Sequence, residues 1–368
     1  MMQLFLSPVD VWLFRDGRPF DANSDHRANS LFPPYPSVMQ GVIRSHQLVV
    51  KGVALHDPDE IKRQVGTVDD YGNLRLCGPF LARWENEQLT RYFPVPTDVW
   101  VNEKTKQFEQ LKLSELDPKI VTSIPQVPMK NGQPAPLKLL VTAHESKPTK
   151  DSPGEWLNQD QLVKCLQGNA VSATKTSDLF VRETRFGIKR NDATRTTEEG
   201  ALYEAEFIRP CKNVGLYVEV EGYSGWAERG VMRIGGEGRG AAYEKITAPA
   251  LPSLKIELPA QFKVYFATPT YFKNGWLPES WSKFFDGEVK LVAAAVNRYE
   301  SIGGFDWTKK GADAQKPARR CVPAGSVYYF ESNGTAKLKN NVLEMNAIAD
   351  EGAQIGFGQI FIQEVNHV

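Results

Sequence analysis

Short strand-like segments separated by glycine and proline turns run through almost the whole chain, and they restrict its fold more than any other feature. The clearest is GLYVEVEGY at 215–223, in which Val218 and Val220 alternate with Glu219 and Glu221. Each half of the chain begins with a strand and contains only one or two helical segments. Doubly wound folds need strands and helices in regular alternation, which is missing here. The pattern therefore predicts an α+β fold.

The length of 368 residues is too great for one compact core and fits two domains better than three. We predict an N-terminal domain at 1–210 and a C-terminal domain at 211–368. Residues 94–155 are rich in Pro, Lys and Gln and have weak periodicity. We interpret them as an insertion in the N-terminal domain.

Several individual elements follow from the local pattern. A strand is predicted at 3–14, and a helix begins with Ser37 as its N-cap. The positions of that helix expected to be buried are Val38, Val42, Ile43, Leu48 and Val49. Further helices are predicted at 156–168 and around 342–352, and residues 178–209 give two strands joined by a basic, threonine-rich loop.

The charge balance excludes some classes of protein. Lys plus Arg and Asp plus Glu each number 44, so the formal net charge is zero, which excludes a polycationic tail and a disordered polyelectrolyte. A local basic stripe remains compatible with this balance. The first residues lack a basic stretch and contain Pro8 and Asp10, so we expect no secretory signal. No apolar run is long enough for a bilayer, and we expect a cytoplasmic protein.

Residues for metal binding or catalysis are few. The four cysteines and five histidines lack the paired spacing of zinc ligands, and the cysteines do not form a disulfide framework. The motifs GxSxG and HExxH are absent. We therefore expect no cofactor and no metal. His26, beside Asp25 in a polar loop, is a candidate general base. A histidine in such a loop is more often structural or a hydrogen-bond donor to RNA.

Two basic segments have the chemistry of RNA contacts. Residues 15–27 contain Arg15, Arg18, His26 and Arg27, and residues 182–195 contain Arg182, Arg185, Lys189, Arg190 and Arg195. Guanidinium groups bind phosphate oxygens through paired hydrogen bonds. Phe186 lies within the second segment and can stack a base if it is exposed. A solvated surface loop is the alternative interpretation of each segment.

Two glycine-rich segments allow two interpretations. GGEGRG at 235–240 and IGFG at 355–358 can bring backbone N–H groups close to an anion. They can equally form tight turns where two backbones pack. The first segment lacks the lysine of a P-loop and the spacing of a dinucleotide-binding loop. Composition alone leaves both alternatives open.

Several longer segments, taken in order, are similar to one known family. They are SPVDVWLFRDGRPF, LFPPYPSVMQGVIR, FGIKRNDATRTTEEGALY, RIGGEGR, ESIGGFD, RRCVPAGSVYYF and IGFGQIFI, from about residue 7 to residue 362. Together they resemble the third subunit of the Cmr complex, the type III-B CRISPR effector. The backbone proteins of that complex are called RAMPs.

This resemblance implies a fold and a role. The implied fold has two ferredoxin-like, RRM-related RAMP domains with loop insertions, the last ending in a glycine-rich loop and strand. The implied role is that of a non-catalytic RNA-binding subunit in antiviral defence. It holds the 5′ repeat-derived tag of the CRISPR RNA, bridges the large polymerase-like subunit to the RAMP backbone, meets target RNA only indirectly and does not bind membranes. Two alternatives remain: a RAMP endoribonuclease that processes precursor CRISPR RNA through His26, and a protein adaptor without RNA contact.

The family motifs, placed on this sequence, give a set of predicted RNA-binding residues. They are Arg15, Gly17, Arg18, His26, Arg44, Arg182, Arg185, Lys189, Arg190, Arg195, Gly235, Gly236 and Arg239. The resemblance implies no catalytic residue. In this interpretation, zero net charge is the average of basic RNA-facing loops and a surface shared with protein partners.

Overall fold

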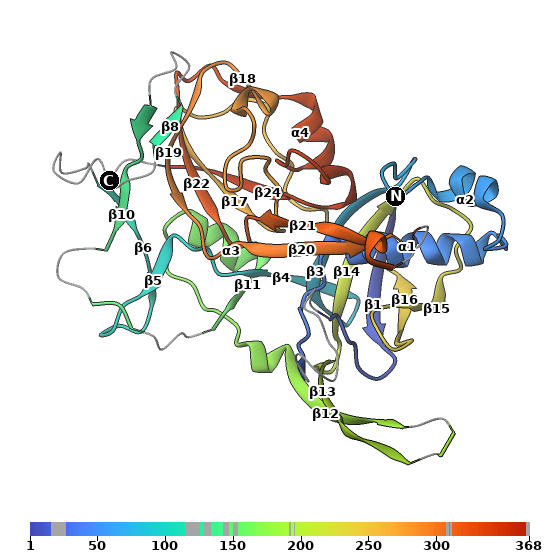
Figure 1. Cartoon of the computed structure of the whole chain (residues 1–368). Coiled ribbons are helices and arrows are strands. Elements are labelled where there is room, and N and C mark those ends of the chain that lie inside the picture. Colours follow the sequence, from blue (N-terminus) through green and yellow to red (C-terminus); the bar gives the residue numbers. More distant parts are fainter. Residues whose placement is uncertain are drawn as a thin grey trace. The chain divides into compact units, whose positions relative to one another are not determined.

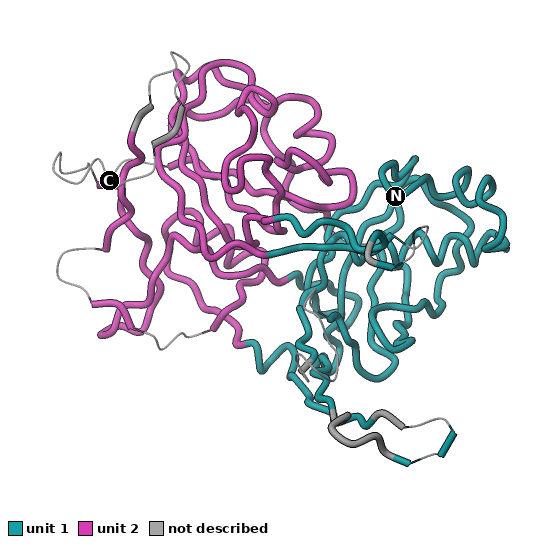
Figure 2. Tube along the Cα trace, viewed as in Figure 1, with its two compact units in different colours: residues 1–91, 176–248, 301–319 teal, residues 92–175, 249–300, 320–368 magenta. Residues whose placement is uncertain are grey.

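The computed structural model describes residues 1–15, 27–114, 126–128, 134–142, 147–149, 154–190, 193–194, 196–306, 309 and 311–365. The chain divides into two compact units (Figure 2). Unit 1 consists of Met1–Arg91, Thr176–Ala248 and Ser301–Arg319, and unit 2 of Tyr92–Lys175, Pro249–Glu300 and Arg320–Val368. The units interleave along the chain, so they do not coincide with consecutive domains at 1–210 and 211–368.

Unit 1 contains an antiparallel sheet with the strand order β3-β14-β1-β16-β15. These strands are Arg75–Glu85, Val214–Glu221, Met2–Pro8, Gly240–Lys245 and Arg229–Arg233. Leu4 and Leu6 of β1 are fully buried and pair in register with Val218 and Leu216. Helix α1 (Pro36–Val50) lies across this sheet (Figure 1). Strand β4 (Gln88–Pro94) runs from unit 1 into unit 2.

Helix α1 differs from the prediction at its start. Its N-cap is Tyr35, which makes no side-chain cap hydrogen bond, and Pro36 opens the first turn. Proline suits this place because its missing N–H needs no partner there. Ser37 therefore lies inside the helix and is not its cap.

The buried face of α1 agrees with the prediction in part. Val42, Ile43 and Leu48 are buried, Val38 is half-buried and Val49 is 74% exposed. Val49 follows Leu48 directly, and consecutive residues of a helix point in different directions. Helix α2 (Pro58–Val65) was not predicted. It has Asp57 as its N-cap, whose side chain accepts a hydrogen bond from Glu60 N at 3.0 Å.

A long hairpin extends from the body of unit 1 (Figure 1). It consists of β12 (Phe180–Arg190) and β13 (Thr197–Pro210), and the short strand β2 (Arg27–Ala28) pairs with β13 in parallel. These two long strands confirm the prediction for residues 178–209. The register pairs Glu183 with Phe207 and Arg185 with Ala205, which places these four residues on one face of the hairpin.

Unit 2 contains a second antiparallel sheet, with the order β19-β22-β17-β24. Its strands are Val289–Ala295, Val327–Ser332, Gln261–Phe266 and Ile360–Glu364. The aromatic residues Phe262, Phe266, Tyr328 and Phe330 form much of its core. Helix α4 (Asn340–Met345) is shorter than the predicted helix at 342–352, because Asn346 has a left-handed backbone conformation that ends it.

The segment at 94–155, predicted as an insertion in the N-terminal domain, belongs instead to unit 2, which includes Tyr92–Lys175. Its described strands are β5 (Val99–Val101), β6 (Phe108–Gln110), β7 (Lys112–Ser114), β8 (Gln126–Pro128), β9 (Pro134–Pro136) and β10 (Leu139–Val141). The Thr97 hydroxyl donates to Ala295 O at 2.6 Å, and Lys138 N donates to Val292 O at 2.7 Å. These contacts attach the segment to strand β19.

The remaining elements are short. Strand β11 (Trp156–Asn158) precedes helix α3 (Gln159–Leu166), so the helix predicted at 156–168 begins three residues later, with Asn158 as its cap. The other strands are β18 (Phe285–Asp286), β20 (Glu300–Phe305), β21 (Gln315–Cys321) and β23 (Lys337–Leu338). No helix in the described ranges is both long and apolar enough to cross a membrane. Several antiparallel sheets with few helices agree with the predicted α+β class.

Candidate nucleic-acid interface

One carboxylate holds two arginines at the base of the hairpin. Arg185 of β12 and Arg209 of β13 donate their Nε–H groups to Glu183, one to each oxygen and both at 2.6 Å. The hydrogen bonds from Arg209 and Arg185 lower the pKa of Glu183. The same contacts raise the pKa of each arginine. Because Glu183 takes the Nε–H groups, the Nη groups of both arginines remain for other acceptors.

A second carboxylate, Asp10, lies two residues beyond the end of β1 and meets three arginines. Its oxygens accept hydrogen bonds from Arg185 Nη2 at 3.4 Å, Arg209 Nη1 at 3.3 Å and Arg239 Nη1 at 3.4 Å. The backbone holds Asp10 in this place. Trp12 N donates to Ile208 O at 2.9 Å and Ile208 N donates to Trp12 O at 2.8 Å, which attaches the segment after β1 to β13.

The Phe207 ring supports two of these guanidinium groups. Phe207 is only 2% exposed. The guanidinium carbons of Arg185 and Arg239 lie 5.0 and 4.7 Å from the ring centroid, which is cation–π geometry. We call Arg185, Arg209 and Arg239 the arginine cluster. Its members come from β12, β13 and the glycine-rich turn between β15 and β16.

The glycines of that turn are explained by packing. Gly235 has a φ of +76°, and a Cβ on it would lie 2.5 Å from Leu13 O. Gly236 N donates to Leu13 O at 2.7 Å, so this N–H is already in use. Ile234 N donates to Arg239 O at 2.9 Å and closes the turn. The tight-turn alternative thus accounts for both glycines, and their contact with RNA stays a prediction.

Other predicted RNA-binding residues make contacts outside the arginine cluster. Arg182 lies on the opposite face of β12, donates to Ser30 O at 2.7 Å and pairs with Glu206. Arg44 of α1 donates to Thr67 O at 2.6 Å, and burial lowers its pKa. Arg15 takes part in a backbone bridge with Ser30.

Some predicted residues fall outside the part of the chain that the structure describes, in whole or for their side chains. Gly17, Arg18, His26 and Arg195 lie outside the described residues. Lys189 and Arg190 belong to the end of β12, and only their backbone is described. Phe186, on the same strand, is 70% exposed, as stacking on a base would require.

Sequence reasoning missed Arg209 and Asp10. In EAEFIRP, Arg209 follows Phe207 at the spacing of two that places both on one face of a strand. That spacing was the available signal for Arg209. Asp10 gave no comparable signal, because it is 199 residues from Arg209 in the sequence.

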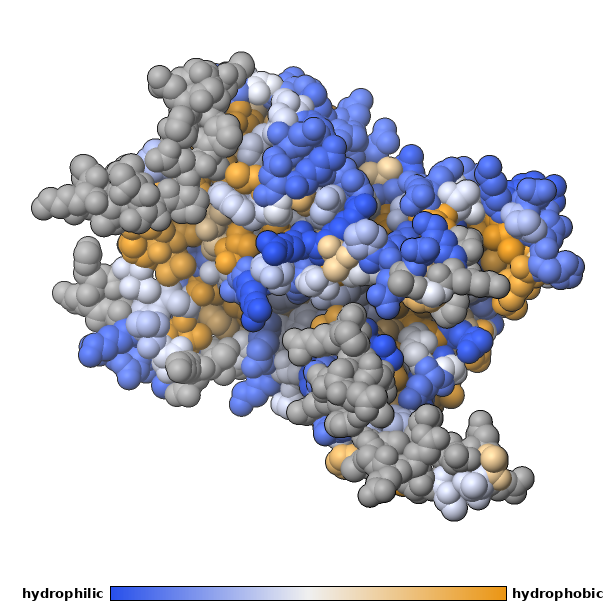
Figure 3. All heavy atoms as spheres, viewed as in Figure 1, coloured by the Kyte–Doolittle hydropathy of each residue, from blue (hydrophilic) through white to orange (hydrophobic). Residues whose placement is uncertain are grey.

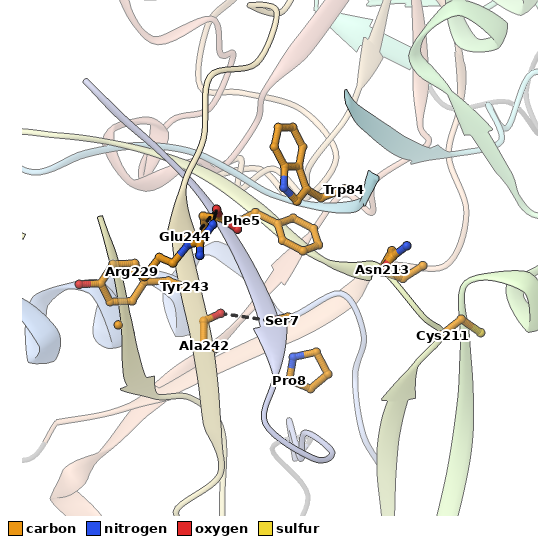
Figure 4. A pocket seen from close by; sticks show the side chains of 12 residues that line it. Phe5, Ser7, Pro8, Trp84, Cys211, Asn213, Arg229, Ala242, Tyr243 and Glu244 are labelled. Atoms are coloured by element: carbon orange, nitrogen blue, oxygen red, sulfur yellow. Dashed lines mark hydrogen bonds and ion pairs between the residues drawn. The ribbon is translucent and has the colours of Figure 1, made fainter. Parts of the chain in front are cut away.

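Unit 1 also has an open groove on its sheet (Figure 4). Its volume is about 590 Å3, and its lining includes Phe5 and Ser7 of β1, Trp84 of β3, and Arg229 with its ion-pair partner Glu244. None of the predicted RNA-binding residues lines it. Among the residues with a described position, no group of three or more His, Cys, Asp or Glu side chains is placed to hold a metal ion.

The family model described as CRISPR-associated protein (Cas_Cmr3) matches residues 4–365, nearly the whole chain. The chain belongs to the Cmr3 family. This confirms the resemblance drawn from the seven sequence segments, of which RIGGEGR contains the turn that carries Arg239. No curated protein sequence matches this Cmr3-family chain.

Solved structures similar to this Cmr3-family chain come from type III CRISPR complexes. A chain of the type III-B Cmr-beta complex bound to cognate target RNA has 16% identity and a TM-score of 0.48, covering 97% of this chain and 96% of that chain. A chain of the Csm3–Csm4 subcomplex of the type III-A interference complex has 13% identity and a TM-score of 0.35, with both chains covered fully. A chain of the Csm1–Csm4 cassette with AMPPNP has 10% identity and a TM-score of 0.36, covering 92% and 97%.

Proposed function

We propose that this chain is a non-catalytic RNA-binding subunit of a type III-B Cmr effector complex in antiviral defence. In this role it holds the 5′ repeat-derived tag of the CRISPR RNA and bridges the large polymerase-like subunit to the RAMP backbone. The observation that carries the proposal is the arginine cluster. Three guanidinium groups from separate segments meet on one face, and two of them stack on a buried aromatic ring.

We also propose that each unit is a ferredoxin-like RAMP domain. Numbered by their order in the chain, strands β17, β19, β22 and β24 of unit 2 lie in the order 4-1-3-2 across an antiparallel sheet. Strands β1, β3, β14 and β16 of unit 1 repeat this order. The order 4-1-3-2 is that of the βαββαβ ferredoxin-like fold. Its appearance in both units supports a duplicated domain.

Guanidinium groups suit the recognition of a single-stranded tag. They bind phosphates in a fixed planar geometry, whereas bases in a single strand stay available for stacking. The glycine-rich turn contributes by placing Arg239 over Phe207 rather than by offering its Gly236 N–H. The exposed Phe186 lies further along β12 and provides an aromatic surface for a base.

Binding of the full-length chain to tag-bearing single-stranded RNA tests this function. We expect the triple variant Arg185→Ala, Lys189→Ala, Arg190→Ala to bind more weakly. Its salt dependence should be flatter by about 0.7 in logarithmic slope for each lost phosphate contact. Arg63→Ala is the matched control, because Arg63 pairs with Glu60 on α2 and makes no contact with the cluster. Equal affinity and slope for the triple variant and wild type would contradict the assignment.

The non-catalytic part of the proposal has its own test. The purified chain is incubated with CRISPR repeat RNA in the presence of EDTA. We expect intact RNA. Cleavage that His26→Ala abolishes would instead identify a precursor-processing endoribonuclease.

Crosslinking of the tag in an assembled complex distinguishes RNA binding from a protein adaptor without RNA contact. For such an adaptor, no crosslink would fall within 15–44 or 182–239.

A further inference from the structure

We propose that the arginine cluster is an anion site that Asp10 occupies in the RNA-free chain, and that an RNA phosphate displaces this carboxylate on binding. The inference deepens the proposed RNA-binding function and rests on it. It assigns to Asp10 the role of an internal competitor for one phosphate. All residues involved belong to unit 1.

The distances show that Asp10 is held loosely. Its three contacts with the cluster measure 3.3–3.4 Å. The two contacts that Glu183 makes with the same arginines measure 2.6 Å. Hydrogen bonds between guanidinium and carboxylate groups are normally about 2.7–2.9 Å long. The Asp10 side chain is also 48% exposed, so it can leave the cluster without unfolding its surroundings.

The cluster keeps its shape without Asp10, because other contacts hold the guanidinium groups. Glu183 fixes the Nε side of Arg185 and Arg209. The Phe207 ring lies against Arg185 and Arg239. Arg239 Nε is buried and has no hydrogen-bond partner, so this arginine has an unused donor. A site whose side chains are already ordered binds its ligand at a smaller cost in conformational entropy.

The charges favour exchange of one anion for another. Three arginines carry three positive charges, and Asp10, Glu183 and Glu237 carry three negative charges, so the group is neutral. A phosphodiester matches Asp10 in charge and in having two oxygens that can accept paired N–H donors. A phosphate that replaces Asp10 therefore leaves the net charge of the group at zero. A phosphate that binds beside Asp10 is repelled by the negative charge of its carboxylate.

Removal of the Asp10 charge is the direct test. Asp10→Asn keeps the shape of the side chain and leaves the cluster with a net positive charge. We expect the full-length variant to bind tag-bearing single-stranded RNA about fivefold more tightly than wild type at low salt, with a steeper salt dependence. Glu60→Gln is the control, because Glu60 pairs with Arg63 on α2, and we expect its affinity to equal that of wild type. Asp10→Ser repeats the experiment if the asparagine variant does not fold.

A second measurement separates this inference from the proposed function. Inorganic pyrophosphate is added to each protein, and its effect on the melting temperature is recorded. We expect millimolar pyrophosphate to stabilise Asp10→Asn more than wild type, by about 2 °C or more.

The outcomes distinguish the two proposals. If Arg185→Ala weakens RNA binding but Asp10→Asn gains neither RNA affinity nor pyrophosphate stabilisation, the RNA function stands and the displacement is wrong. If neither variant changes RNA binding, the RNA assignment fails. A pyrophosphate effect confined to Asp10→Asn would then still support the anion site, and its absence would overturn that site too.

Discussion

Lys263 and Asp98 form a buried ion pair in unit 2, with 3.0 Å between Nζ and Oδ2. Their side chains are 2% and 0% exposed. The same oxygen also accepts hydrogen bonds from Tyr329 Oη at 2.6 Å and from Gln110 Nε2 at 2.8 Å. Asp98 thus joins the segment at 94–155 to strand β17, because it neutralises the charge that Lys263 brings into the core.

We predict that Asp98→Ala lowers the free energy of unfolding by about 3–5 kcal/mol, because it leaves the Lys263 ammonium buried and unpaired. The double variant Asp98→Leu, Lys263→Met should recover most of this loss. Urea denaturation of the full chain measures both effects. Glu279→Ala, which removes exposed ion pairs with Lys273 and Lys283, is the control and should change stability much less than Asp98→Ala does. If Asp98→Ala were as stable as this control, the ion pair between Lys263 and Asp98 would not contribute to the stability of the fold.

The glycine-rich turn gives a prediction that links stability to RNA binding. Gly52 and Gly235 both have positive φ, but a Cβ on Gly52 would have no heavy atom within 4 Å. Gly52→Ala should therefore cost only the conformational penalty of about 1–2 kcal/mol. Gly235→Ala should cost clearly more, because its Cβ would clash with Leu13 O and move the turn. The same shift displaces Arg239 from Phe207, so we expect weaker RNA binding as well. Equal losses of stability in the two variants would argue against the role of packing in this turn.

The strands were more predictable than their arrangement. Alternation revealed β14, and the two strand-like ends of 178–209 revealed the hairpin, because each pattern lies within one short segment. The interleaving of the two units was not predictable in this way. It depends on contacts such as that between Thr97 and Ala295, whose side chain and backbone partner lie 198 residues apart.

The candidate site, too, was predictable from the sequence only in part. Family motifs selected Arg185 and Arg239, and the structure brings both to Phe207. The same motifs selected Gly236, whose N–H bonds to Leu13, and Arg44, which binds Thr67. A motif marks the residues that a family shares, but it does not separate those that support the turn from those available to a ligand. That separation requires the hydrogen-bond partners.

The four cysteines should differ in reactivity. Cys165 and Cys321 are buried, whereas Cys77 and Cys211 are partly exposed. Burial raises the pKa of Cys165 to about 12, so the thiolate that reacts with disulfide reagents is scarce. With Ellman's reagent at pH 8 we expect Cys211→Ser to remove one fast-reacting thiol. Cys165→Ser should remove only a thiol that reacts after urea is added. If Cys165→Ser instead lost a fast-reacting thiol, the Cys165 thiol would not be buried in the folded chain.

The last prediction concerns His46 of α1 and the stability of the chain at mildly acidic pH. Its ring packs edge-on against Trp226 and Tyr243, with centroid distances of 4.5 and 5.1 Å, and Nε2 is buried without a hydrogen-bond partner. Burial lowers the pKa of His46 below its ordinary value of 6.5. As the pH falls below about 6.5, the unfolded chain therefore binds a proton at this residue before the folded chain does, and stability is lost.

We predict that the free energy of unfolding of the wild type falls between pH 7.5 and pH 5.5, by at most about 1.4 kcal/mol per pH unit from this one residue. His46→Phe should flatten the dependence, because it keeps an aromatic ring at this place and removes the titrating group. His56→Phe is the matched control, since His56 is exposed, and it should retain the slope of the wild type. Carboxylates with a lowered pKa, such as Glu183, change charge below this range and do not contribute to it. Urea denaturation at both pH values measures the slopes, and identical slopes for His46→Phe and wild type would exclude His46 as their source.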